Sequence, residues 1–383
     1  MRLILGADLL DDRRCGMRIC LESFLDEVAR QKRQDELDLL HGVPLGHDSP
    51  QGFRSRLVPY SDGRGAKLIW SQIRLPVWLR QTDYEVIHWP YQIMPPGRSP
   101  IPLTVAVWDL APMLHREPGW GRFSTALKYE MILGRALRNA AHIITHSRAV
   151  AHDIVEKFKI APEAISVIYP GLSSRFQTEA ENEVVSPAGH GILYVGTDTT
   201  RKNLNLLLEA YGLLVKDGCR EPLRLRVTDD EKHQKIIRER ARSFKIPKEL
   251  LLFESAVNLE GLIALYRDVR LLVFPSLYEG FGLPMIEAMA CGVPVVALNC
   301  STMPEVLGDA GLLVDEPKPR PFADRIAECL AWDNDRRRQR IEAGRKQALR
   351  FQWSTSVEQH FQVWEAVACN TAPTDVGEPW ANE

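Results

Sequence analysis

The sequence predicts two α/β domains, each built on a parallel, doubly wound sheet. Apolar runs of strand length alternate with longer helical patterns along the chain, and this alternation occurs twice. A polar segment at residues 173–190, rich in Ser and Glu, separates the two series. The 383 residues also exceed the length at which a single hydrophobic core stops growing. These observations place one domain on each side of one linker.

The expected elements follow in chain order, each strand being a short apolar run typical of a strand buried on both faces. We expect the first domain to span 1–172, the second to span 191–355, and residues 370–383, which lack an apolar pattern, to form a flexible tail. The first series has strands at 3–7, 86–88, 103–107, 142–145 and 165–168, and helices at 123–139 and 149–158. The second has strands at 191–195, 223–227, 251–253, 271–275, 293–298 and 311–314, and helices at 204–215, 230–244, 259–266, 285–290 and 321–331.

Charge is balanced over the whole chain but not along it. With 48 Lys and Arg against 50 Asp and Glu, the formal net charge is −2, which disfavours a nucleic-acid partner. Residues 1–175 hold 23 basic and 19 acidic side chains, whereas residues 176–383 hold 25 and 31. The front half is therefore about +4 and the back half about −6. If this split follows the domains, it points to an anionic acceptor or membrane surface at the first domain.

Several classes of protein and site are disfavoured by the sequence. No run approaches the roughly 20 apolar residues of a membrane span, and the amino terminus turns acidic too early for a signal peptide, so we expect a cytoplasmic protein. The seven cysteines show neither CxxC nor zinc-ligand spacing. Neither half has GxGxxG after a strand, which disfavours a dehydrogenase. The DxD-like match at 333–335 is interpreted as the solvated end of a helix, and no metal site is expected.

The first loop whose residues could bind a ligand follows the strand at 191–195. Gly196 ends the strand, Arg201 and Lys202 follow, and a helix begins near Leu204 with Asn203 as the expected side-chain cap. Free backbone N–H groups, the helix dipole and two cations would all face a bound phosphate. The alternative is a solvated basic loop before an ordinary helix.

The second loop follows the strand at 271–275 and carries two glutamates. Gly280 and Gly282 permit close approach of the backbone to a ligand, and Pro284 suits the first turn of the next helix. Glu279 and Glu287 are eight residues apart, about 12 Å along a helix, which is wider than the pair of a glycoside hydrolase. The spacing favours two contacts to one elongated ligand, with carboxylates accepting from vicinal hydroxyls.

These two loops resemble a known family. EGFGLPMIEAMACGVPVV resembles the E-x7-E motif of the retaining GT-B glycosyltransferases of family GT4, and YVGTDTTRKNLNLLLEAY resembles that family's loop with a phosphate-binding lysine. The segments STMPEVLGDAGLLVDE, FQWSTSVEQHF, EVIHWPYQ, LTVAVWDLAPM and AHIITHSRAVAHDI continue the resemblance over nearly the whole chain. It implies two Rossmann-like domains facing across a cleft, with a carboxyl-terminal helix at about 356–369 completing the first domain.

The resemblance also implies roles for single residues. Glu279 is expected to contact the hydroxyls of the donor sugar, Glu287 the ribose, and Lys202 the diphosphate. Gly16, in RRCGMRICLESF, matches the glycine loop that approaches the diphosphate from the first domain. The remaining donor-binding positions are Gly196 and the backbone N–H groups around Gly280, Phe281, Gly282 and Leu283.

Three positions depart from the family pattern. Thr197 stands where many relatives have Arg, and Arg201 is expected to supply that charge. The first-domain glycine loop is bulkier and more basic than usual. The family's His-Asp pair is here Trp108-Asp109, which leaves Asp109 as the candidate for the acceptor hydroxyl or the donor sugar.

The resemblance implies transfer of a hexose-type sugar from a nucleoside-diphosphate sugar to a glycan or lipid-linked acceptor, in surface polysaccharide or glycoconjugate biosynthesis. Cations at the leaving diphosphate make a metal cofactor unnecessary in this expectation. His88, Trp108 and Arg74 are the acceptor-side candidates, and the amphipathic basic segment 66–81 is a candidate for peripheral contact with the inner face of an anionic membrane. Two alternatives stay open: a phosphorylase or epimerase on the same fold, and a non-catalytic nucleotide-sugar-binding subunit.

Overall fold

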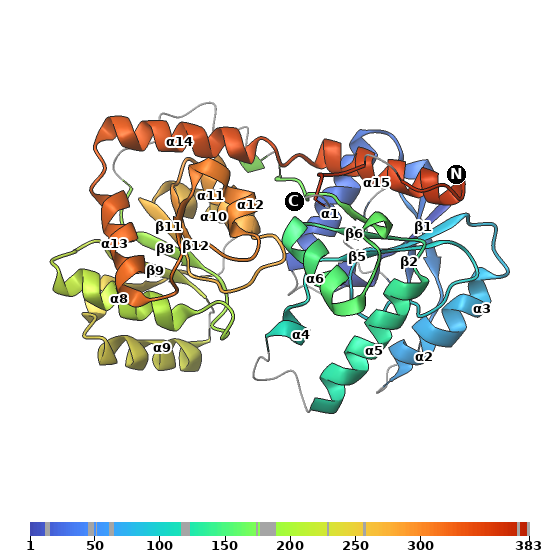
Figure 1. Ribbon diagram of the computed structural model, residues 1–383, viewed down its shortest axis with the longest axis horizontal. Helices are drawn as coiled ribbons and strands as arrows, with labels where there is room; N and C mark the ends of the chain where they lie inside the picture. The colour runs from blue at the N-terminus through green and yellow to red at the C-terminus, as the bar shows by residue number, and fades with distance from the viewer. Residues whose placement is uncertain are drawn as a thin grey trace. The chain divides into compact units, whose positions relative to one another are not determined.

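The protein, seen in a computed structural model, divides into two compact units (Figure 1). Unit 1 comprises Met1–Leu114, Gly119–Gly171 and Gln352–Glu383, and unit 2 comprises His115–Pro118 and Leu172–Phe351. Apart from His115–Pro118, the chain passes to unit 2 after Gly171 and returns to unit 1 after Phe351, compared with the expected boundaries of 172 and 355. Most of the expected linker lies outside the described residues, which are 1–11, 16–44, 50, 52–60, 65–115, 123–173, 175–176, 189–227, 230–255, 258–373 and 376–380.

Unit 1 is built on a seven-stranded sheet in which all neighbouring strands are parallel. In spatial order its strands are β3 (Arg54–Leu57), β2 (Leu37–His41), β1 (Leu3–Gly6), β4 (Val86–Trp89), β5 (Leu103–Val107), β6 (His142–Thr145) and β7 (Ile165–Val167). Helices α1 (Gly16–Arg30) and α15 (Trp353–Ala368) pack together on one face of this sheet (Figure 1). The other helices are α2 (Ala66–Ile69), α3 (Leu75–Leu79), α4 (Ala111–Leu114), α5 (Phe123–Asn139) and α6 (Arg148–Phe158).

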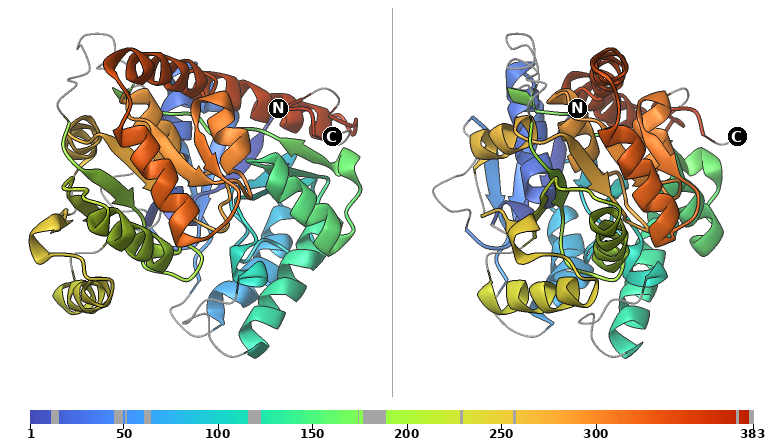
Figure 2. Two further views of the ribbon diagram at one scale, coloured as in Figure 1. Left: turned by 60° about the vertical axis from the view of Figure 1, so that its left-hand side comes forward. Right: turned by 90° about the vertical axis from the view of Figure 1, so that its left-hand side faces the viewer.

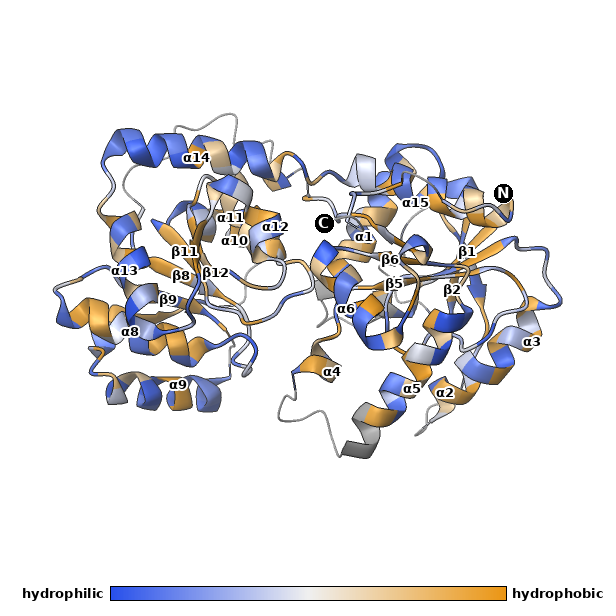
Figure 3. Cartoon of the chain, viewed as in Figure 1, coloured by the Kyte–Doolittle hydropathy of each residue, from blue (hydrophilic) through white to orange (hydrophobic). Residues whose placement is uncertain are grey.

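Unit 2 is built on a six-stranded parallel sheet. Its spatial order is β10 (Leu251–Phe253), β9 (Leu223–Arg226), β8 (Ile192–Val195), β11 (Leu271–Phe274), β12 (Val295–Leu298) and β13 (Leu312–Val314). The helices are α8 (Leu204–Lys216), α9 (Glu231–Ser243), α10 (Leu259–Arg267), α11 (Leu283–Ala290), α12 (Met303–Leu307), α13 (Pro319–Leu330) and α14 (Asn334–Ala348). The turned views show α8 and α13 side by side (Figure 2). The strands are largely apolar, whereas α9 and α14 are mostly hydrophilic (Figure 3).

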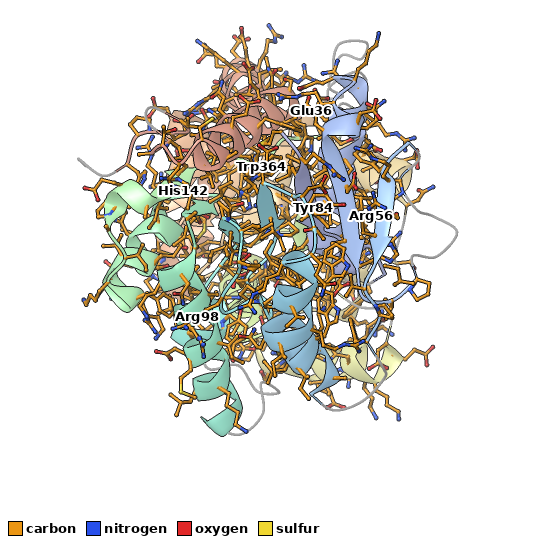
Figure 4. All side chains as sticks on the ribbon, turned by 90° about the vertical axis from the view of Figure 1, so that its right-hand side faces the viewer. Glu36, Arg56, Tyr84, Arg98, His142 and Trp364 are labelled. Carbon is orange, nitrogen blue, oxygen red and sulfur yellow. The ribbon has the colours of Figure 1, made fainter. Side chains whose placement is uncertain are left out.

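The sequence predicted neither of the outer strands β2 and β3 of unit 1, and for β3 the physical reason is its exposure. All four residues of β3 are exposed, so the strand has no apolar side to recognise. It is held instead by Asp38 of β2, which accepts from Arg54 Nε at 2.8 Å and Arg56 Nε at 3.0 Å. Tyr84 donates its hydroxyl to the same carboxylate at 2.6 Å, and Arg56 and Tyr84 lie together at this edge (Figure 4). Burial alone would raise the pKa of Asp38, but these hydrogen bonds lower it.

The described part of the carboxyl-terminal tail is packed against unit 1, so the expectation of a flexible segment is wrong for residues 376–380. Glu378 forms an antiparallel bridge with Val167 of the edge strand β7, and its N–H donates to the Val167 carbonyl at 2.8 Å. Gly377 has φ +92 and lies so close to Val167 that a Cβ would come within 2.4 Å of its oxygen. Trp380 is 7% exposed and donates Nε1–H to the Ile165 carbonyl at 3.3 Å.

The charge split of the two halves does not separate the two units. Residues 352–383 carry five acidic and no basic side chains, and they belong to unit 1. Counted by unit, the formal charge is −2 for unit 1 and 0 for unit 2. The charges of +4 and −6 for the two halves arise because the acidic end of the chain belongs to unit 1. The difference in charge between the halves therefore gives no support for an anionic partner of unit 1.

Within the described part of the chain, no helix combines the length and apolar character that a bilayer crossing requires.

Replacing Trp380 with alanine should lower the free energy of unfolding by about 2–3 kcal/mol, because a buried indole and its hydrogen bond are lost. Urea denaturation measures the effect. Trp380→Phe, which keeps most of the apolar contact, should cost less. A loss below about 0.5 kcal/mol for the alanine variant would show that the segment does not pack against β7 in solution.

Candidate functional site

The two predicted loops meet because of the strand order in unit 2. Strands β8 and β11 are hydrogen-bonded neighbours, but the chain leaves them in opposite directions, to β9 and to β12. In sheets of this kind, the carboxyl ends of two strands at such a switch point are the usual position of a ligand site. Here the loops are also tied together, since Leu277 N–H donates to the Arg201 carbonyl at 2.8 Å.

Glu279, Lys202 and Arg201 form one buried ion-pair cluster at this switch point. Lys202 Nζ lies 2.6 Å from Glu279 Oε1, and Arg201 Nη1 lies 3.0 Å from Oε2. Arg201 also donates to the Tyr278 carbonyl at 2.9 Å. Glu279 is 7% exposed, so the charges are shielded from water. The described contacts thus place two cations at one carboxylate, a local arrangement that favours an anionic ligand.

The backbone of Glu279 is fixed by a residue that the sequence analysis did not assign. The Ser301 hydroxyl accepts from Glu279 N–H at 3.1 Å and donates to the Glu279 carbonyl at 2.9 Å. Thr302 Oγ1–H then donates to the Phe281 carbonyl at 2.9 Å. Ser301 has φ +52, an unusual conformation for a serine, which marks a specialised turn. Nothing local in the sequence signals it, because its partner is 22 positions away.

The glycine loop leads into α11 as the sequence predicted. Gly282 has φ +99 at the amino-terminal cap of the helix, a conformation that glycine adopts without strain. Leu283 is the first helical residue and half-buried Gly280 precedes the turn. Phe281 is buried against the ring of Phe351, with centroids 5.3 Å apart. The loop is therefore anchored on both sides, with its backbone held rigid.

Glu287 lies in the second turn of α11. Its Oε2 accepts the hydroxyl of Tyr266, from α10, at 2.8 Å. Burial raises the pKa of Glu287 to about 7, although the Tyr266 hydrogen bond acts in the opposite direction. The sequence identified the glutamate but not its tyrosine, which sits on a separate helix.

The start of α8 differs in one detail from the expectation. Asn203 occupies the cap position, but it has φ +53 and its side chain makes no capping hydrogen bond. Gly196 N–H donates to the Arg226 carbonyl at 3.1 Å, which ends β8 against β9. The first N–H groups of α8 are thus left without the expected asparagine cap, beside Lys202.

In unit 1, the structure brings together only some of the predicted residues. His88 is buried and its Nδ1 lies 2.9 Å from Thr104 Oγ1. Trp108 donates Nε1–H to the Pro90 carbonyl at 2.9 Å, and both His88 and Trp108 line one cavity. Asp109 instead accepts from Ala111 N–H at 3.0 Å, which caps α4. The remaining two candidates lie elsewhere in the unit: Gly16 is the first residue of α1, and Arg74 is exposed in the short π-helix Trp70–Arg74.

The DxD-like segment at 333–335 lies at the start of a helix, whereas the sequence analysis interpreted it as the end of one. Asp333 is the amino-terminal cap of α14 and accepts from Arg336 N–H at 2.8 Å, so the segment begins a helix rather than ending one. Among the residues that the structure describes, no three His, Cys, Asp or Glu side chains cluster closely enough to hold a metal ion.

Comparison with known proteins gives matches over both units. The model described as Glycosyl transferases group 1 matches residues 178–347, and the model described as Glycosyltransferase Family 4 matches residues 24–175. The chain is 32% identical over 247 residues to the O-antigen chain mannosyltransferase B of Escherichia coli. That match covers 62% of this chain and 63% of the relative, so it spans less than two thirds of the relative's length.

Solved structures share the fold at low sequence identity. Sucrose-phosphate synthase from Thermosynechococcus elongatus superimposes with a TM-score of 0.75 at 19% identity, covering 97% of this chain and all of that one. HepE from Anabaena, in complex with UDP and glucose, gives a TM-score of 0.70 at 17% identity over 96% of this chain and all of that one. These likenesses establish the GT-B architecture that the sequence predicted.

The raised pKa of Glu287 predicts a dependence of stability on pH. Between its ordinary value of 4.5 and about 7, the folded protein keeps a proton that the unfolded chain has released. The free energy of unfolding should therefore fall as the pH rises through this window, and Glu287→Gln should remove that part of the fall. Urea midpoints at several pH values measure it, with exposed Glu209→Gln as the control. Parallel profiles for the wild type and Glu287→Gln would contradict the raised pKa.

Proposed function

The chain belongs to the group 1 glycosyl transferases, and from this premise we propose that it moves a hexose from a nucleoside-diphosphate sugar to a glycan or lipid-linked acceptor. The observation that carries the proposal is the cluster of Arg201 and Lys202 on the Glu279 carboxylate. It lies where two helix-initiating loops meet, and its two cations suit a diphosphate.

Glycosyl transfer breaks a C–O bond and leaves a nucleoside diphosphate on which negative charge grows. In the proposed mechanism, Lys202 and Arg201 transfer their contacts from Glu279 to this diphosphate, so Glu279 becomes available to the sugar hydroxyls. Cations already held in a shielded site stabilise the developing charge without reorganisation at the moment of reaction. The backbone N–H groups at the start of α11 add to the same effect, and no metal ion is needed in this scheme.

We assign the reaction to the retaining class, as the E-x7-E motif implies. The acceptor attacks on the face from which the diphosphate departs, and the leaving phosphate oxygen takes the acceptor's proton. The bond to the acceptor oxygen forms as the anomeric C–O bond breaks, so no separate enzymic base is required. Glu287, whose raised pKa makes the carboxylate form predominate only above about pH 7, accepts the ribose hydroxyls.

The donor sugar is proposed to be mannose and the product a surface polysaccharide. Support comes from the Escherichia coli relative, which is named an O-antigen chain mannosyltransferase. The neighbour HepE was solved with UDP and glucose, so a thermal-shift panel should include both GDP-mannose and UDP-glucose. A ligand that binds the folded state raises its apparent stability, and the larger shift identifies the donor.

Lys202→Ala should lower kcat by about 10²–10³-fold with the authentic donor, because a cation that stabilises the leaving diphosphate is lost. Steady-state kinetics measure the effect, with exposed Lys232→Ala of α9 as the matched control. A decrease of tenfold or less, with Lys232→Ala unaffected, would contradict the assigned role.

A second surface supports the proposed contact with an anionic membrane. Ile69, Ile73 and Val77, at intervals of four along α2 to α3, are 56%, 59% and 48% exposed. Arg74 and Arg80 are exposed within the same segment. An apolar stripe next to cations is typical of a helix that lies on a lipid surface.

Other residues of that segment, expected on the surface, belong to the core or to ion pairs. Trp70 and Leu79 are fully buried, and Lys67 Nζ lies 3.1 Å from Asp8 Oδ2. The lipid-facing surface is therefore narrower than the sequence suggested, and it consists of the three aliphatic side chains and two arginines.

Changing both Arg74 and Arg80 to Glu should weaken binding to vesicles containing anionic lipid by at least about tenfold, since each basic residue near such a surface contributes about 1 kcal/mol. Vesicle co-sedimentation measures the binding. The matched control changes two exposed cations of α14, Arg338 and Lys346, to Glu. Equal binding by both double variants would contradict a membrane role for the segment.

A further inference from the structure

The two cations of the proposed diphosphate site, Arg201 and Lys202, lie on a tight turn that joins β8 to α8. The N–H groups of Lys202 and Asn203 both donate to the Thr199 carbonyl, at 3.1 and 3.2 Å, and Asn203 has φ +53. Every residue from 199 to 203 is half-buried or exposed, so the turn has no fully buried side chain. A segment with few buried apolar contacts opens easily unless polar contacts hold it. The placement of the cations therefore depends on contacts made from outside the turn.

Arg240, in the last turn of α9, contacts both ends of this turn. Helices α8 and α9 are neighbours in unit 2 (Figure 1). Arg240 Nη2 donates to the Asp198 carboxylate, just before the turn, and Nη1 donates to Asn205 Oδ1, in the first turn of α8, at 2.9 Å. A guanidinium is planar and its N–H groups are fixed relative to one another. One side chain therefore sets the distance between the two ends of the turn.

The contact of Arg240 with Asp198 is the stronger of the two. The Asp198 side chain is 10% exposed, and a hydrogen bond between opposite charges that are shielded from water is stronger than a neutral one. His233 Nε2, also from α9, lies 3.1 Å from the same carboxylate oxygen. Asp198 thus keeps a partner on α9 when Arg240 is changed, so such a substitution does not leave a shielded carboxylate alone.

Tyr194 links the Asp198 contact to the Glu279 cluster. It is 1% exposed, and its hydroxyl donates to the Thr197 carbonyl at 2.8 Å. Burial raises the pKa of Tyr194, and the nearby carboxylates of Glu279 and Asp198 act in the same direction. Gly196 packs beside this hydroxyl, since a Cβ there would come within 3.0 Å of the oxygen. Both carboxylates therefore lie close to one phenol, at the point where the chain leaves β8.

We propose that Arg240 is a positioning residue for sugar transfer, because it bridges Asp198 and Asn205 and so fixes the turn between them. That turn presents Arg201 and Lys202, and Arg240 acts through it rather than on the substrate. Cations that are held in place before the reaction stabilise the growing charge of the leaving group without reorganisation. The inference rests on the proposed function, since the fixed turn serves transfer only if its cations meet a diphosphate.

Amide hydrogen exchange of the ligand-free full chain, followed by mass spectrometry, tests the hold of Arg240 on the turn. Arg240→Leu should speed exchange at residues 199–203 by about 5–10-fold, the effect of one hydrogen bond on local opening. Arg240→Lys keeps the charge but lacks the fork that reaches two partners, so it should restore slow exchange only in part. The matched control is Arg242→Leu, which removes an exposed cation from the same turn of α9.

Kinetics then test whether the held turn matters for transfer. With GDP-mannose or UDP-glucose, Arg240→Leu should lower kcat by about tenfold, because the cations are no longer fixed in place. In a Lys202→Ala background the same change should lower kcat by no more than about threefold, since one of the groups that Arg240 positions is already absent. A merely structural role predicts the same loss in both backgrounds.

The two measurements separate this inference from the proposed function. Unchanged exchange at residues 199–203 in Arg240→Leu, or an equal increase in Arg242→Leu, would overturn the inference whatever the activity of the chain. Equal losses of kcat in the wild-type and Lys202→Ala backgrounds would overturn it as well. A wild type that transfers no sugar, with faster exchange in Arg240→Leu, would instead refute the proposed function and leave the hold on the turn intact. Thermal unfolding identifies an Arg240→Leu variant that fails to fold, and Arg240→Lys then decides.

Discussion

The arrangement of both units depends on one constraint, the point at which the strand order of a parallel sheet reverses. In unit 2 this point lies between β8 and β11, and it brings Arg201 and Lys202 next to Glu279, although 77 positions separate Lys202 from the glutamate. In unit 1 it lies between β1 and β4, beneath the cavity with the histidines and tryptophans. The carboxyl ends of strands at such a point are the usual position of a ligand site in these sheets.

The ion-pair cluster costs free energy to form, and a bound ligand would offset part of that cost. The three charged side chains are between 9% and 17% exposed, and removal of charges from water costs several kcal/mol for each ion. Their mutual attraction offsets part of this cost, and Ser301 holds the Glu279 backbone so that the geometry is maintained. The local concentration of two cations at one carboxylate, rather than the neutral total charge of unit 2, is what the proposed diphosphate site depends on.

The two units differ in the chemistry that they place at the carboxyl ends of their strands. The loops of unit 2 offer cations, carboxylates and helix N–H groups, which recognise phosphate and vicinal hydroxyls. The cavity of unit 1 is lined by indoles and by imidazoles whose pKa is lowered by burial.

The sequence by itself determined the two parallel sheets and the order of most buried elements, because buried strands and glycine turns leave local patterns. It also singled out Lys202, Glu279 and Glu287 as candidates. Only the tertiary structure decided the rest. Strand β3 depends on Asp38 from a neighbouring strand, and the tail depends on the hydrogen bond of Trp380 to Ile165 of β7. Ser301, Tyr266 and Arg240 acquire their roles from partners distant in sequence, and the charge of each unit depends on the chain's return after Phe351. Local sequence patterns do not encode such long-range contacts.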